Sequence, residues 1–95
     1  MFEKAKAINE LRKIQSALAK EIIKIETGNG AVKVTINGAQ EIKKVTLDEA
    51  IVREADIAKL EKWIESGVSQ AITKSQQLAA EKMKAISGGL GIPGL

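Results

Sequence analysis

The residues of this chain that could do chemistry are mainly lysines, and three of them recur at a fixed spacing near the N-terminus. Lys6, Lys13 and Lys20 are seven residues apart, so on a helix they fall in nearly one line, with a line of glutamates beside them. Two interpretations stay open at this point. The line is either a solvated helix face with paired charges or an exposed edge that contacts the phosphates of a polyanion.

Most catalytic and metal-binding chemistry is absent. The chain has no Cys and no His, and it carries neither a phosphate-binding P-loop nor a dinucleotide fingerprint. Residues 88–94 are glycine-rich but follow a helix instead of opening one, so they cannot present helix N–H groups to phosphate. Carboxylates cluster in 48–56, where we interpret them as helix caps in preference to acid–base pairs or cation ligands. We predict a protein that is not an enzyme and uses no catalytic residue, metal, cofactor or small-molecule substrate.

Composition favours one small basic domain. The 95 residues carry a formal net charge of +3, and a chain of this length forms a marginal core that a partner subunit would help to complete. Phe2 and Trp63 are the only aromatic residues, so duplex backbone is a better partner than single-stranded bases, which need stacking platforms. We find no apolar run of about 18 residues and no secretory signal, and we expect a soluble cytoplasmic protein without membrane contact.

Two turns indicate a small sheet. Asn37-Gly38 separates two apolar-rich runs, and both residue types tolerate positive φ, so a hairpin is predicted between 31–36 and 41–47. With a strand near 23–27 before the turn at 28–30, this gives a three-stranded antiparallel meander. Ile42 is out of phase with Val45, which a bulge or a strand start at Lys43 would reconcile. The residues expected to point inward are Ile23, Ile25, Val32, Val34, Ile36, Val45 and Leu47.

Long helices are predicted on both sides of the sheet, giving an α+β fold of order α-β-β-β-α. Residues 1 to about 20 carry apolar side chains at helical spacing, and a second helix starts between Glu54 and Asp56 and ends near Ile86. The second helix would be about 50 Å long, too long to pack entirely on its own sheet. We therefore expect the two helices to project together as an antiparallel pair. Gly67 either allows a close backbone approach or is merely tolerated in the second helix.

The over-long apolar stripe of the second helix predicts a homodimer, because it would otherwise leave a large exposed patch. Lys4 and Lys82 fall within the stripes of the two helices near the projecting tip. They either extend to solvent at a frayed end or form an open basic jaw. The residues assigned to the core or dimer stripe are Leu60, Ile64, Val68, Ala71 and Ile72.

The hairpin also carries a family resemblance. Residues 30–38, Gly-Ala-Val-Lys-Val-Thr-Ile-Asn-Gly, followed by 41–48, Glu-Ile-Lys-Lys-Val-Thr-Leu-Asp, resemble the hallmark of the YbaB/EbfC nucleoid-associated proteins of bacteria. The charged N-terminal helix, the late second helix and the glycine-rich 88–94 are similar as well. One departure is visible, because the family usually has a proline in the acidic loop after the third strand and 49–54 has none.

This resemblance implies a DNA-binding homodimer shaped like tweezers, in which the sheets join and the helices project as arms. It implies a nucleoid protein that binds duplex DNA with little or no sequence specificity, since lysine–phosphate contacts do not read bases. Residues 1–87 would form the domain and 88–95 a flexible tail. By this resemblance the candidate DNA-binding residues are Lys6, Arg12, Lys13 and Lys20 on the first helix, with Lys74, Lys82 and Lys84 on the second.

A second function remains open from the residues alone. The amphipathic helices could instead bind a protein partner, with the charges serving solubility. The two functions differ in salt dependence, because only phosphate binding releases counterions from DNA.

Overall fold

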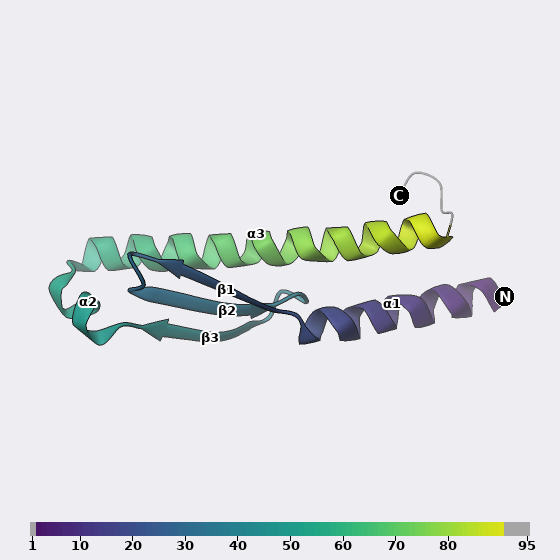
Figure 1. Ribbon diagram of the computed structural model, residues 1–95, viewed down its shortest axis with the longest axis horizontal. Coiled ribbons are helices and arrows are strands. Elements are labelled where there is room, and N and C mark those ends of the chain that lie inside the picture. Colours follow the sequence, from purple (N-terminus) through teal and green to yellow (C-terminus); the bar gives the residue numbers. More distant parts are fainter. Residues whose placement is uncertain (1, 91–95) are drawn as a thin grey trace.

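The chain forms a helix, a three-stranded antiparallel sheet, a short helix and a long helix (Figure 1). The computed structural model describes the backbone of residues 2–90 and the side chains of residues 6–85. The elements are α1 (Phe2–Lys20), β1 (Ile22–Thr27), β2 (Val32–Asn37), β3 (Ile42–Leu47), α2 (Glu49–Glu54) and α3 (Ile57–Leu90). The predicted α-β-β-β-α order is therefore confirmed, with α2 as an additional short helix.

The molecule is elongated, measuring 60 × 22 × 15 Å. Its radius of gyration is 17.7 Å, against roughly 12–13 Å for a compact domain of this length. The extra length comes from α1 and the second half of α3, which run side by side beyond the end of the sheet (Figure 1). The predicted pair of projecting antiparallel helices is thus present.

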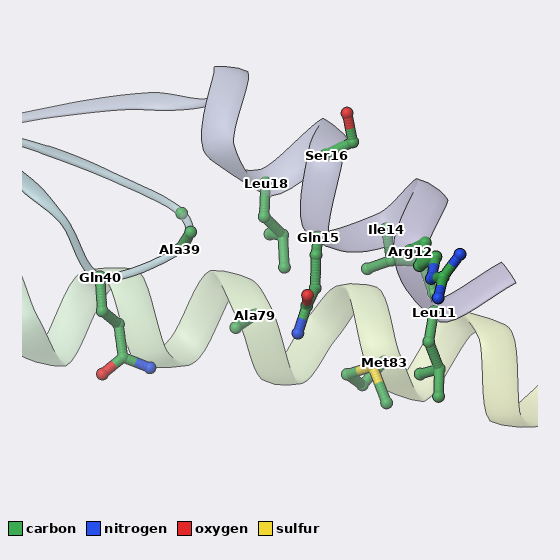
Figure 2. Close-up of a pocket in the computed structure, with 11 residues that line it drawn as sticks. Leu11, Arg12, Ile14, Gln15, Ser16, Leu18, Ala39, Gln40, Ala79 and Met83 are labelled. Atoms are coloured by element: carbon green, nitrogen blue, oxygen red, sulfur yellow. The ribbon is translucent and has the colours of Figure 1, made fainter. Parts of the chain in front are cut away.

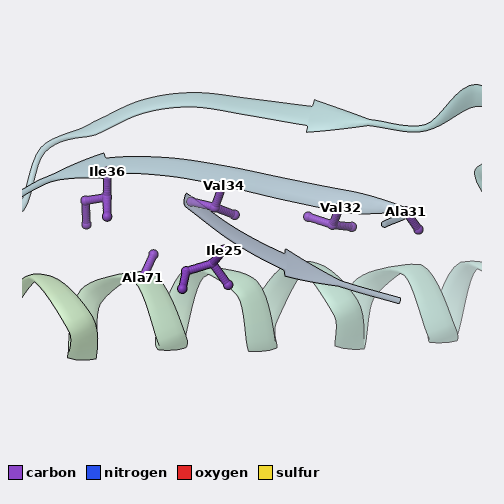
Figure 3. Close-up of a cluster of buried hydrophobic side chains, with 6 residues drawn as sticks. All are labelled: Ile25, Ala31, Val32, Val34, Ile36 and Ala71. Atoms are coloured by element: carbon purple, nitrogen blue, oxygen red, sulfur yellow. The ribbon is translucent and has the colours of Figure 1, made fainter. Parts of the chain in front are cut away.

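The hydrophobic core lies between α3 and the first two strands (Figure 3). Its buried members are Ile25, Ala31, Val32, Val34, Ile36 and Ala71. Gly67 of α3 faces β2 so closely that an added Cβ would lie 3.2 Å from Val34 Cγ2. Of the two interpretations of this glycine, the structure favours the close backbone approach. Trp63 is half-buried against the same core, packed over Gly28.

β3 lies outside this core. It pairs with β2 so that Val45 faces Val34 and Leu47 faces Val32, and a register shift beside Ile36 makes Lys43 the extra residue of a bulge. The predicted bulge is confirmed. Paired residues point to the same face, yet the residues Ile42, Val45 and Leu47 are 44%, 47% and 44% exposed. Val45 and Leu47 therefore point inward, as predicted, but they are not buried. One helix about 10–12 Å wide covers two strands spaced about 4.8 Å apart and leaves the third uncovered.

The hairpin between β2 and β3 forms as predicted, but its turn works differently. Neither Asn37 nor Gly38 has a positive φ; the left-handed residue is Gln40, with φ of 64°. The N–H of Gln40 donates to the Asn37 carbonyl at 3.3 Å, and the N–H of Asn37 donates to the Glu41 carbonyl at 3.0 Å. The connection is therefore a three-residue loop that ends in a left-handed residue.

The side chain of Asn37 holds this turn together, and it is completely buried. Its Nδ2 donates to the Ala19 carbonyl at 3.2 Å and to Glu41 Oε1 at 2.8 Å, while its Oδ1 accepts from the N–H groups of Ala39 and Glu41. One amide thus fixes the loop and also holds the last turn of α1. A buried polar group of this kind is tolerated because all of its hydrogen bonds are made.

The same loop is attached to α3 and to the end of α1. The buried Ser75 hydroxyl donates to the Asn37 carbonyl at 2.8 Å and accepts from the Gln40 N–H at 3.0 Å. Gly38 donates its N–H to the Leu18 carbonyl at 2.8 Å, and an added Cβ there would lie 2.8 Å from that same oxygen. We call these contacts among Leu18, Asn37, Gly38 and Ser75 the polar junction, and it fixes where the two projecting helices leave the sheet.

The carboxylates after β3 cap helices, as the sequence suggested. Asp48 Oδ1 accepts from the Ile51 N–H at 3.0 Å at the start of α2, and Asp56 Oδ1 accepts from the Lys59 N–H at 2.8 Å at the start of α3. The second cap agrees with the predicted helix start. The predicted end near Ile86 is too early, since α3 continues to Leu90. The glycines at 88 and 89 do not end the helix, because a glycine lowers helix stability by only about 1 kcal/mol.

Replacing Asn37 with Ala should destabilise the protein by about 2–3 kcal/mol, because the Ala19 carbonyl and the Ala39 N–H lose their buried partner. Urea unfolding followed by circular dichroism, at one protein concentration, measures this. The matched control is Asn9→Ala on the exposed surface of α1, which should change stability by less than about 0.5 kcal/mol. Equal stability of the two variants would show that the polar junction does not hold α1 to the sheet.

Candidate nucleic-acid interface

The predicted line of lysines is exposed along α1. Lys6, Lys13 and Lys20 are all solvent-exposed, and we call them the basic line. At 100° per residue they lie about 120–160° around the helix from Leu18, which is buried. Leu18 lines the space between α1 and α3, so the basic line is on the side of α1 turned away from α3.

The basic line has little local neutralisation. Lys13 Nζ lies 3.7 Å from Glu10 Oε1, and the Lys13 side chain is still 75% exposed. Among the side chains of residues 6–85, Lys6 and Lys20 have no carboxylate within ion-pair distance. Exposed pairs such as Lys13–Glu10 contribute little energy, so all three ammonium groups can turn toward an external phosphate.

Arg12 lies elsewhere, in the groove between the projecting helices (Figure 2). This open groove has a volume of about 710 Å³. Apolar side chains form much of its lining, including Leu11, Ile14 and Leu18 from α1 and Met83 from α3. Arg12 is itself exposed at the edge of this groove, about 80–120° around α1 from the three lysines of the basic line.

The predicted basic residues of α3 do not gather at one place. Lys82 Nζ lies 3.9 Å from Glu21 Oε1, so it is directed toward the junction of α1 and β1. Lys74 borders a small pocket beside Ile23, and Lys84 is exposed. The open basic jaw considered above would consist of Lys4 and Lys82. The side chain of Lys4 lies outside the described residues, so the jaw stays a prediction.

The apolar stripe of α3 faces the sheet of its own chain. Leu60, Ile64 and Val68 are half-buried against the core, Ala71 is buried, and Ile72 is 36% exposed. The more exposed apolar row belongs to β3, where Ile42, Val45 and Leu47 stand uncovered. The alternating sequence put Val45 and Leu47 on the correct face but carried no signal of how far α3 would reach across it.

Four lysines of the sheet were not among the predicted site residues. Lys24, Lys33, Lys43 and Lys44 are exposed, on the strands themselves. The strand pattern could have identified them, because the polar residues that alternate with the core residues of a strand point to its other face.

Negative charge gathers at the opposite end of the molecule from the helix tips. Residues 48–65, which form α2 and the start of α3 (Figure 1), contain six carboxylates against Arg53, Lys59 and Lys62. Arg53 is ion-paired with Glu49. This end is therefore the part of the described chain least suited to a polyanion. Its three basic residues can be replaced as a control, because their loss removes positive charge from a surface that is not expected to bind DNA.

Within the described residues, no group of three or more His, Cys, Asp or Glu side chains is arranged to hold a metal ion. The helices described here also include none that is long and apolar enough to cross a membrane. The exposed lysine ammonium groups can bind anions by charge and hydrogen bonding.

Known proteins resemble the chain over nearly its whole length. The model of the YbaB/EbfC DNA-binding family matches residues 1–90. A nucleoid-associated protein of Syntrophobacter fumaroxidans is 37% identical over 95 residues, covering 99% of this chain and 86% of that protein. Another, from Ruminiclostridium cellulolyticum, is 33% identical over 96 residues, covering 100% and 84%. An uncharacterized Helicobacter pylori protein of known crystal structure shares the fold, with a TM-score of 0.68 at 16% identity, covering 90% of this chain and 95% of that one.

Proposed function

The chain belongs to the YbaB/EbfC DNA-binding family, and from this we propose that it binds duplex DNA as a homodimer, with little or no sequence specificity, through basic residues on its projecting helices. The family is one of DNA-binding proteins and not of enzymes. The observation that carries the proposal is the exposed basic line, which lies on the side of α1 turned away from α3. The relatives' names support a location at the nucleoid.

The geometry of the basic line suits a phosphate backbone. Successive lysines are about 10.5 Å apart along the axis, so the line spans about 21 Å of helix edge. Flexible lysines bind phosphates as point charges and do not discriminate bases. With Phe2 and Trp63 as the only aromatic residues and Trp63 half-buried in the protein, base stacking contributes little. Affinity should therefore depend on salt far more than on sequence.

The exposed edge of the sheet supports dimerisation through β3. Ile42, Val45 and Leu47 form an apolar row on a strand that has a neighbour on one side only. An edge strand with an apolar face favours pairing with another chain, and a second copy offers the same surface in a two-fold arrangement. Such a dimer would carry two basic lines and double the number of phosphate contacts.

Replacing Val45 with Asp should weaken the dimer, raising its dissociation constant by roughly a hundredfold or more, because a carboxylate would be buried at the contact in both subunits. Light scattering across a concentration series measures the mass, with the unmodified protein expected at twice the 10.2 kDa chain mass. Thr46→Asp, on the other face of the same strand, is the control and should remain dimeric. A monomeric parent, or a Val45→Asp variant that dimerises as well as the control, would contradict the proposal.

Replacing Lys6, Lys13 and Lys20 with Gln should flatten the dependence of log K on log salt by up to about 5, since six contacts in a dimer contribute about 0.9 each. Gel-shift titrations of random duplex in a salt series measure this. The control is Arg53, Lys59 and Lys62 changed to Gln, which removes the same charge at the acidic end.

Both variants must first be shown to be folded dimers. If the α1 variant and the control keep the same slope, α1 is not the contacting element. If the unmodified protein fails to bind duplex even at low salt, the proposed DNA binding itself is wrong, and a protein partner for the amphipathic helices becomes the better explanation.

A further inference from the structure

The face of the sheet turned away from α3 is uncovered and basic. Strand register places Lys24 opposite Thr35 and Thr35 opposite Lys44, in one row across all three strands. The next row holds Glu26, Lys33 and Thr46. Since these positions alternate with the core residues, they point to the opposite side, which we call the outer face.

The outer face carries more positive charge than local partners neutralise. Within the three strands Glu26 is the only carboxylate, and its Oε1 lies 3.7 Å from Lys33 Nζ. Lys24 and Lys44 are exposed and make no ion pair with any described residue. Lys24 and Lys44 therefore flank Thr35 with unpaired ammonium groups, and their backbones are about 9.6 Å apart across two strand spacings.

This surface suits phosphate better than it suits a protein or a base. Lysine and threonine side chains, which make up most of it, are both common donors to phosphate oxygens. The two rows hold no aromatic or aliphatic side chain, so they offer no stacking platform. An exposed apolar side chain, Ile22, lies beside them on the same face of β1 as Lys24. The charge is complementary to a polyanion.

The outer face also lies on the same side of the molecule as the basic line. The line is turned away from α3, and so is the outer face, because the core between sheet and helix occupies the other side (Figures 1 and 3). Lys20 ends α1, and Lys24 lies on β1 four residues later. Glu21, between the two elements, is ion-paired with Lys82. Positive charge therefore continues from α1 onto the sheet.

We propose that the outer face, through Lys24 and Lys44, binds the phosphate backbone of the same duplex that the basic line contacts. The inference rests on the proposed DNA binding and extends it from the projecting helix to the body of the protein. If two chains pair through β3, their outer faces join into one surface with the two Lys44 residues near its centre. The duplex then lies against the side of the dimer opposite α3, and the apolar groove of Figure 2 is not its binding site.

The test is the double variant Lys24→Gln, Lys44→Gln compared with Lys59→Gln, Lys62→Gln, which removes equal charge from exposed positions of α3 near the acidic end. In gel-shift salt series with random duplex, the sheet variant should lower the slope by up to about 3.6, from two contacts in each of two subunits at about 0.9 each. The control should leave the slope close to that of the parent. A sheet variant with the affinity and slope of the control overturns the inference.

Lysine modification of the unmodified protein gives a second readout. Mass spectrometry after reductive methylation should show Lys24 and Lys44 protected by duplex, with Lys59 and Lys62 equally reactive with and without it. Protection of the basic line without protection of Lys24 and Lys44 would overturn this inference and leave the proposed function intact. If the parent binds no duplex at all, the proposed function fails first, so the two failures are distinguishable.

Discussion

α3 is both longer and narrower than the sheet that it covers. Its 34 residues span about 51 Å at 1.5 Å per residue, whereas six-residue strands span about 20 Å. Its width covers two strands and not three. The excess length gives the arm that runs beside α1, and the missing width leaves the apolar row of β3 exposed. The elongated shape and the exposed edge therefore have one common cause in the geometry of a single helix on a small sheet.

The polar junction makes this arrangement specific. A helix that extends beyond its sheet has few tertiary contacts to direct it. Among the described side chains of α1, the buried ones are Ile14 and Leu18, in its last two turns. Asn37, Gly38 and Ser75 bind the end of α1, the hairpin loop and the middle of α3 at one point. Buried hydrogen bonds are directional, so they fix the orientation of the helices where hydrophobic contacts alone would allow them to slide.

Local patterns were enough to predict most of the fold. Helical spacing located α1 and the start of α3, and strand alternation located the sheet and even the bulge at Lys43. Long-range features were not accessible in this way. The role of Asn37 depends on α1 and α3 meeting around its side chain, and the exposure of Val45 depends on the width of α3. The same holds for the candidate site. Helical periodicity is enough to predict that the basic line is exposed. The ion pair of Lys82 with Glu21 could not be predicted, because it joins segments far apart in the sequence.

The proposed binding mode requires duplex DNA to lie against the side of the protein turned away from α3. Amide chemical-shift mapping of the isotope-labelled protein with a short random duplex tests this directly. The largest changes should fall around Lys13 and Lys20 on α1 and around Lys24 and Lys44 on the sheet, and they should diminish as salt is raised. Changes concentrated instead around Leu11 and Met83, which line the groove between the helices, would contradict the account.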